Sequence, residues 1–110
     1  MDWFDAIYKK QMEFQKFLLN KENIEPNPVT MYHSATAAMV EIGEMLQEDT
    51  RWKNAMGSVR PATYNPDEFK KEFADVFIFL LNVLMYSGIS SEEIKNVIKT
   101  KIDINWSRKL

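Results

Sequence analysis

The segment "EFKKEFADVFIFLLNVLMY" (residues 68–86) brings two acidic residues to the edge of the most apolar part of the chain. Glu72 and Asp75 directly precede residues 76–86, in which Asn82 is the only amide or charged side chain. A run of this kind predicts a helix that is buried all round. An unpaired carboxylate is costly to bury, so such a group shifts its pKa, pairs with a cation, or holds a metal ion.

The length and composition predict a single domain over residues 1–110. The chain has 110 residues, of which 45% are hydrophobic and 13% aromatic. It is long enough for one core, but a core of that size is modest for so many apolar side chains. The surplus apolar surface predicts a homo-oligomer.

The charges and the cysteine count bear on partners and setting. The chain has 14 basic and 16 acidic residues and no run of Lys or Arg, which predicts no nucleic-acid and no anionic membrane partner. The apolar run is shorter than the roughly 20 residues that a membrane span requires, and the first ten residues lack the apolar core of a signal sequence. The absence of cysteine excludes disulfides and thiolate metal sites and favours a cytoplasmic setting.

The apolar periodicity predicts an all-α fold of four helices, completed by oligomerisation. Glycine and proline lie mainly between periodic segments, which disfavours strands joined by tight turns. The predicted helices cover about residues 2–19, 28–49, 66–87 and from 91 towards the carboxyl end, with a loop at 53–65. The predicted N-caps are Asn27, Asn65 and Ser90, and the prolines predicted at first helical positions are Pro28 and Pro66.

The last predicted helix changes character along its length. The side expected to face inward is marked by Ile94, Val97 and Ile98. At 100° per residue the same side continues as Lys101, Asn105 and Arg108. An inward-facing Lys and Arg suit phosphate oxygens, which Arg binds bidentately. Salt bridges to the acids of the chain are the alternative.

Two pairs of acids stand at the same spacing on two different predicted helices: Glu41 and Glu44 in "EIGE", and Glu72 and Asp75 in "EFAD". Residues three apart share a helix face, so four carboxylates converge if the two helices pack antiparallel. A divalent cation would relieve the repulsion among them. Mg2+ is the natural candidate because it takes oxygen ligands and bridges carboxylates to phosphates.

A solvated helix face and a di-iron site are the alternatives to a Mg2+ site at these acids. Taken alone, Glu41 and Glu44 fit an ordinary solvated face, although Glu72 and Asp75, beside the apolar run, fit one less well. A di-iron bundle also uses carboxylates on several helices, but it requires Glu-x-x-His pairs. The only histidine, His33, has no acid at that spacing, which excludes the di-iron site.

Three further side chains suit a nucleotide ligand. Asn82, seven residues after Asp75 and on the same face, either reads the polar edge of a ligand or hydrogen-bonds within the protein. Trp52 and Lys53, just after the second predicted helix, either stack on a base and contact a phosphate or belong to the core.

The order "EIGE", a loop, "EFADVFIFLLNVLMYSGI" and "KIDIN" resembles the all-α nucleoside triphosphate pyrophosphatases, the superfamily of MazG-like proteins, dCTP pyrophosphatases and dimeric dUTPases. The resemblance spans about residues 31–108. It implies a MazG-like four-helix bundle that hydrolyses a nucleoside triphosphate to the monophosphate and pyrophosphate, with Mg2+ as cofactor. It also implies dimers or tetramers, and the short chain favours the tetramer.

The resemblance assigns roles by position. The acids that look like the metal ligands are Glu41, Glu44, Glu72 and Asp75. The residues that match the family's phosphate- or base-contacting positions are Lys101, Asn105 and Arg108. The segment "RWK" (51–53), with Trp52 and Lys53, looks like the aromatic and lysine segment of members specific for dCTP or dUTP.

The expected activity is Mg2+-dependent pyrophosphohydrolysis of a pyrimidine deoxynucleoside triphosphate such as dCTP or dUTP. Glu44 is the expected base that orients or deprotonates the attacking water, with Glu41 and Glu48 as alternatives. Lys101 and Arg108 are expected to stabilise charge on the leaving pyrophosphate. Two other functions stay open: a non-catalytic oligomeric helical adaptor held by inter-subunit salt bridges, and a nucleotide-binding regulator without turnover.

Overall fold

The computed structural model describes residues 2–25, 27–57 and 59–108, and these residues form five α-helices. They are α1 (Trp3–Lys21), α2 (Pro28–Gln47), α3 (Arg51–Ala55), α4 (Pro66–Tyr86) and α5 (Ser91–Ser107). The predicted all-α fold is confirmed, and the four predicted helices correspond to α1, α2, α4 and α5. Within the described ranges no single helix is both long and apolar enough to cross a membrane, and α4 with α5 passes that test only as a pair bent by 114°.

The predicted capping residues explain where three of the helices begin. Asn27, Asn65 and Ser90 each accept a hydrogen bond from a backbone N–H group in the first turn of the following helix. Pro28 and Pro66 occupy the first helical positions, where an N–H group would have no partner within the helix.

The short helix α3 corrects the prediction for the segment after α2. Helix α2 ends at Gln47 rather than near residue 49, and residues 53–55 belong to α3 rather than to a loop. The Trp52 Nε1–H group donates to the Leu46 carbonyl at 3.2 Å, and the Thr50 N–H group donates to the Thr63 carbonyl at 2.8 Å. A helix of five residues depends on such contacts, which local periodicity does not report.

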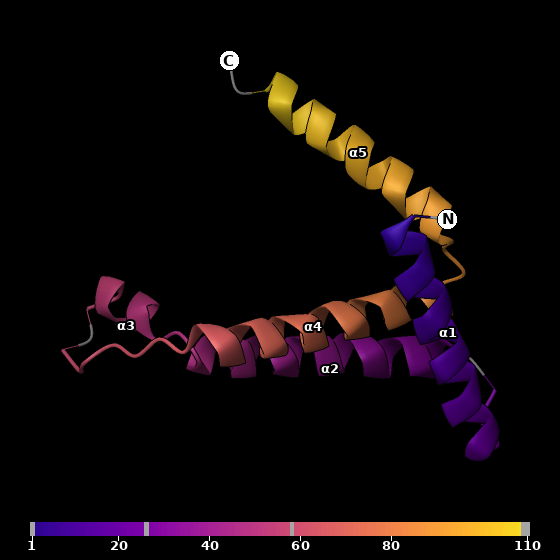
Figure 1. Cartoon of the computed structure of the whole chain (residues 1–110), viewed down its shortest axis with the longest axis horizontal. Helices are drawn as coiled ribbons and strands as arrows, with labels where there is room; N and C mark the ends of the chain where they lie inside the picture. Colours follow the sequence, from indigo (N-terminus) through magenta and orange to yellow (C-terminus); the bar gives the residue numbers. More distant parts are fainter. Residues whose placement is uncertain (1, 26, 58, 109–110) are drawn as a thin grey trace.

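Helices α2 and α4 form an antiparallel hairpin at the centre of the fold (Figure 1). The Asn65 N–H group, directly before α4, donates to the carbonyl of Glu48, directly after α2, at 2.8 Å. This bond sets the register of the two helices. The buried residues of these two helices are Ser34, Ala38, Val76, Leu81 and Asn82.

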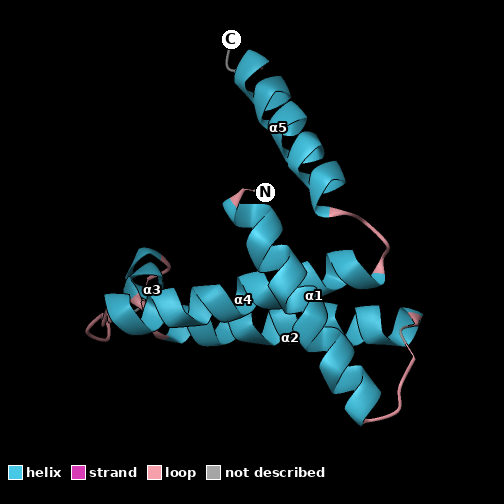
Figure 2. Cartoon of the chain, turned by 45° about the vertical axis from the view of Figure 1, so that its right-hand side comes forward, coloured by secondary structure: helices cyan, strands magenta, loops and turns pink. Residues whose placement is uncertain are grey.

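Helix α1 crosses the half of α4 that holds the apolar run (Figure 2). Phe4 meets Phe77 edge to face, with ring centroids 6.3 Å apart. One to two turns further along both helices, the Gln11 Nε2–H group donates to Asn82 Oδ1 at 3.0 Å. Helix α1 therefore covers one side of α4 from about Phe77 onwards. The prediction of a helix buried all round is wrong for the single chain, since Ile78 and Leu80 are 38% and 46% exposed.

Helix α5 leaves the rest of the molecule and packs against α1 alone among the described helices (Figure 1). Residues 96–108 are all exposed, and the radius of gyration is 17.3 Å, against about 13 Å for a compact domain of this length. The expectation that this side faces inward is wrong in the single chain for Val97 and Ile98, which are 61% and 46% exposed. Ile94, in the first turn of α5, is half-buried. Periodicity identifies the apolar side of a helix but not the chain that covers it.

Candidate active site

Three carboxylates from the two helices of the hairpin meet at one point. One oxygen each from Glu41 of α2 and from Glu72 and Asp75 of α4 lies within 4.8 Å of the others. Glu41 comes seven residues before Glu48, and Glu72 comes seven residues after Asn65, the two residues joined at the loop. The hairpin register therefore sets these two acids opposite each other, and Asp75 follows one turn along the same face.

Glu44, the fourth acid of the expected cluster, is not among these three. It is exposed and lies one turn after Glu41 on α2. Its carboxylate nevertheless contributes to the raised pKa of Glu41. Glu44 therefore stands at the edge of the cluster rather than inside it.

The cluster favours a proton or a cation. Burial raises the pKa of the half-buried Glu41 to about 7, and the nearby carboxylates of Glu44, Glu72 and Asp75 add to the rise. Oε2 of Glu41 and Oε2 of Glu72 are buried without a hydrogen-bond partner in the described part of the chain. Buried carboxylate oxygens that lack a donor cost free energy, so this arrangement asks for a positively charged ligand.

This donor set fits a divalent cation that prefers oxygen. The three residues offer only carboxylate oxygens, which are the ligands of Mg2+ and Ca2+ rather than of softer metals. Two buried oxygens without a donor would gain a partner, and the exposed Asp75 lies on the solvent side of the group. A site open on one side suits Mg2+, which keeps several waters or substrate oxygens.

An apolar cavity of about 410 Å³ lies between α1 and α4. Its lining includes Ile7, Phe14, Phe77 and the amide of Gln11. Asn82 is 3% exposed, and its Oδ1 accepts the hydrogen bond from Gln11. Of the two roles expected for Asn82, the internal hydrogen bond is the one present in the single chain.

Trp52 and Lys53 lie on α3, at the loop end of the hairpin. The Trp52 side chain hydrogen-bonds the Leu46 carbonyl, yet the residue is 41% exposed. The Lys53 ammonium lies 5.6 Å from the centroid of the Trp52 ring. An aromatic face and a cation are thus available together near the acid-bearing half of α4.

Lys101, Asn105 and Arg108 lie on the exposed part of α5. Because α1 is the one helix in the described ranges that α5 packs against, these ranges do not bring the three side chains to the acids of α2 and α4. Figure 1 shows this end of α5 directed away from the hairpin.

Comparison with protein-family models gives a match to the family described as dUTPase, over residues 3–108. The chain belongs to the dUTPase family. The matched residues include all five helices, and the match confirms the superfamily that the order of the motifs resembles. Membership of the dUTPase family supports hydrolysis of nucleoside triphosphates as the class of activity. No curated protein and no solved structure matched the chain.

In this dUTPase-family chain, sequence reasoning missed the polar contacts of α1. Gln11 donates to Asn82, and Gln15 accepts from the Tyr86 hydroxyl at 2.6 Å. The two glutamines are four residues apart, and so are their partners on α4. The signal in the sequence is the spacing of the two glutamines, which places two amides on one side of an amphipathic helix and so predicts polar contacts with a neighbouring helix. Gln11, which also lines the apolar cavity, joins the candidates for ligand contact.

Proposed function

We propose that this chain is a Mg2+-dependent pyrophosphohydrolase that converts a pyrimidine deoxynucleoside triphosphate to the monophosphate and pyrophosphate, with dUTP as the first substrate candidate and dCTP as the second. The observation that carries the proposal is the group of Glu41, Glu72 and Asp75 within 4.8 Å, in a chain of the dUTPase family. A single domain over residues 1–110 and a cytoplasmic setting, which the lack of cysteine supports, are part of the proposal.

Glu41, Glu72 and Asp75 would hold the Mg2+ ion. When bound, the ion neutralises the cluster and withdraws charge from the triphosphate oxygens. Glu44 lies beside Glu41 but outside the group of three, so it is our candidate for the base that takes a proton from the attacking water, ahead of Glu41 and Glu48. With attack at the α-phosphorus, the water oxygen bonds to that phosphorus and Glu44 takes the proton. The α–β phosphoanhydride bond breaks, and pyrophosphate leaves with the electron pair of that bond.

The phosphate-binding face would come from α5. Lys101 and Arg108 would stabilise the charge on the leaving pyrophosphate, and Asn105 would complete this face. Since α5 points away from the acids of its own chain, this face would meet the cluster of a second copy. The exposed apolar side chains of α5, among them Val97 and Ile102, support a homo-oligomer, which we expect to be a tetramer rather than a dimer.

The base would be recognised at two places. The exposed face of Trp52 suits stacking, with the Lys53 ammonium near a phosphate. Asn82 would act through its hydrogen bond to Gln11, whose amide borders the apolar cavity between α1 and α4. An apolar pocket with a few polar groups is the usual form of a base site.

The test is a panel of the common deoxynucleoside and nucleoside triphosphates assayed for pyrophosphate with Mg2+. Glu44→Gln and Asp75→Asn are expected to abolish release while circular dichroism reports unchanged helix content. Asp67→Asn, an exposed acid in the first turn of the same helix as Asp75, is the matched control and should keep full activity. Undiminished turnover by Asp75→Asn contradicts the proposal, and nucleotide binding without release identifies a regulator instead.

A further inference from the structure

Among the described helices, α5 packs only against α1, and the contacts lie near the beginning of α5. Residues 96–108 are exposed, and α1 is the one described helix that α5 packs against. Within one chain, the direction of α5 is therefore set by its first turn and by the turn before it. In that turn, the hydroxyl of the buried Tyr8 donates to the Ile89 carbonyl.

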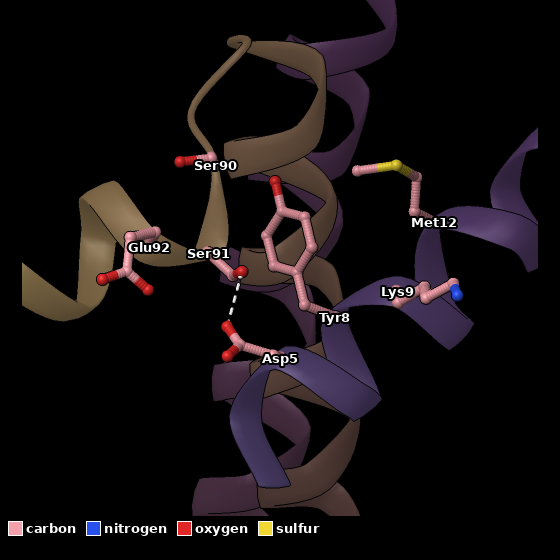
Figure 3. A pocket seen from close by; sticks show the side chains of 7 residues that line it. All are labelled: Asp5, Tyr8, Lys9, Met12, Ser90, Ser91 and Glu92. Atoms are coloured by element: carbon pink, nitrogen blue, oxygen red, sulfur yellow. Dashed lines mark hydrogen bonds between the residues drawn. The ribbon is translucent and has the colours of Figure 1, made fainter. Parts of the chain in front are cut away.

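Asp5 of α1 holds two residues of α5 at once. Its Oδ1 accepts a hydrogen bond from the Ser91 hydroxyl at 2.7 Å (Figure 3), and its Oδ2 accepts one from the Lys95 ammonium at 2.7 Å. Lys95 also pairs with Asp2 at 2.8 Å and with Glu92 at 3.4 Å. Ser91 and Lys95 are four residues apart and share a face of α5. Two attachments on one turn constrain both the tilt of α5 and its rotation about its own axis.

These charges are more sheltered than those of an ordinary surface ion pair. The side chains of Lys95 and Asp5 are 26% and 22% exposed, whereas those of Lys71 and Glu68 are 72% and 44% exposed. The hydrogen bond from Lys95 lowers the pKa of Asp5 to about 2. A sheltered pair within a network holds its geometry better than an isolated exposed one.

Small changes at this attachment are amplified at the far end of the helix. Arg108 follows Lys95 by about thirteen residues, or roughly 20 Å at 1.5 Å per residue. A tilt of about 10° at Lys95 therefore moves Arg108 by roughly 3.5 Å. Lys101, Asn105 and Arg108 also lie within roughly 60° of one another around the helix, so a rotation of α5 turns all three together.

We propose that Asp5, Ser91 and Lys95 are positioning residues, which set the direction and rotation of α5 and thereby the place where its cationic face meets the substrate triphosphate. The inference rests on the proposed function, because it takes Lys101 and Arg108 as phosphate-binding residues. Positioning residues do not touch the substrate or the acid cluster. Their loss therefore acts on substrate binding and leaves Mg2+ binding unchanged.

The kinetic test compares Lys95→Met with Lys99→Met, which removes an exposed lysine from the same helix. Lys95→Met is expected to raise KM for dUTP by about tenfold or more and to change kcat less, because displacements of an ångström or more weaken positioned contacts steeply. Lys99→Met should stay within about twofold of wild type. Lys95→Arg keeps the charge and should restore most of the affinity, whereas a role in stability alone would leave KM unchanged.

A distance measurement tests the positioning without any activity. The chain has no cysteine, so spin labels can be placed with Asn20→Cys on α1 and Ser107→Cys on α5. Labelled protein diluted into unlabelled protein then reports distances within one chain. Lys95→Met is expected to broaden the distance distribution, and Lys99→Met is not.

The two measurements separate the possible failures. If wild type releases no pyrophosphate from any triphosphate, the proposed function fails, and the label distances still decide whether Lys95 positions α5. An unchanged distance distribution together with an unchanged KM in Lys95→Met overturns the inference. If Lys95→Met loses helix content, Asp5→Asn, which keeps the side-chain shape, takes its place with the same expected results.

Discussion

The raised pKa of Glu41 makes Mg2+ binding depend on pH. In the metal-free protein this pKa is about 7, chiefly because the carboxyl is buried and because Glu44 and Glu72 lie nearby. A carboxylate ligand must be ionised, so the metal has to displace the proton. At pH 6 about nine in ten molecules hold it, and at pH 8 about one in ten. The apparent Kd for Mg2+ is therefore expected to be roughly tenfold weaker at pH 6 than at pH 8.

The same pKa sets how the stability of the metal-free protein varies with pH. The folded pKa of Glu41, about 7, lies above the ordinary value of 4.5, so between these values the folded state binds more protons than the unfolded state. The contribution of Glu41 to stability is thus present below pH 4.5 and is lost as pH rises through 7. At pH 8, Mg2+ at 100 times its Kd adds about 2.7 kcal/mol to the free energy of unfolding, or roughly 10–20 °C in Tm for a domain of this size.

The assay is a Mg2+ titration at pH 6 and pH 8, followed by calorimetry and by thermal unfolding. Glu41→Gln should bind Mg2+ more weakly at pH 8, lose the difference between the two pH values, and in chelator unfold at a higher temperature than wild type. Asp67→Asn should behave as wild type. Equal Kd values for wild type at both pH values, or the same Mg2+ response in Glu41→Gln, would refute the reasoning.

Three further predictions follow from packing and charge. Ala38→Leu overfills a position that is 2% exposed and should lower the free energy of unfolding, measured in urea, by about 1–3 kcal/mol. The same variant should bind Mg2+ more weakly, and an unchanged Mg2+ affinity would contradict this prediction. Ile102→Glu on α5 should dissociate the oligomer in light scattering, whereas Asn96→Glu on the other side of that helix should not; equal masses would argue against an interface there. The hydrogen bond from Lys95 lowers the pKa of Asp5 to about 2, so the stabilisation by the ionised Asp5 is lost as pH falls from about 4 through 2. In Asp5→Asn, the free energy of unfolding measured in urea should therefore decline less over this pH range.

The helix ends and the opposed acids follow from short-range chemistry. A cap such as Asn65 acts on amide groups within three residues, so the sequence reports it directly. The meeting of Glu41 with Glu72 needs one further assumption, an antiparallel hairpin, which the short connection makes the natural choice. Spacing alone does not separate Glu44 from the group of three, because Glu72 and Asp75 are also three residues apart and both belong to it.

The elements that the sequence could not predict depend on contacts between distant segments. The direction of α5 rests on Lys95 and Asp5, which are 90 positions apart, and helix α3 rests on the contact between Thr50 and Thr63. Neither pair stands out from other polar residues in the sequence. Periodicity marked the apolar side of α5, but in the single chain that side is uncovered.

The change from acidic to apolar residues at position 76 marks the place where α1 begins to cover α4. Side chains of α1 contact Phe77, Asn82 and Tyr86 of α4. The run from residue 76 is therefore apolar because its side chains fill the contact surface between α1 and α4. The turns of α4 before residue 76 pack on α2 but lie outside the surface that α1 covers. Glu72 is therefore half-buried and Asp75 is exposed. At such a border, helix α2 on the opposite side excludes part of the water around the carboxylates. The other side of the carboxylates stays open, so a metal ion and its remaining ligands can reach them. The acids therefore occur beside the apolar run because the edge of a covered surface is where a charged ligand site is both reachable and partly dry.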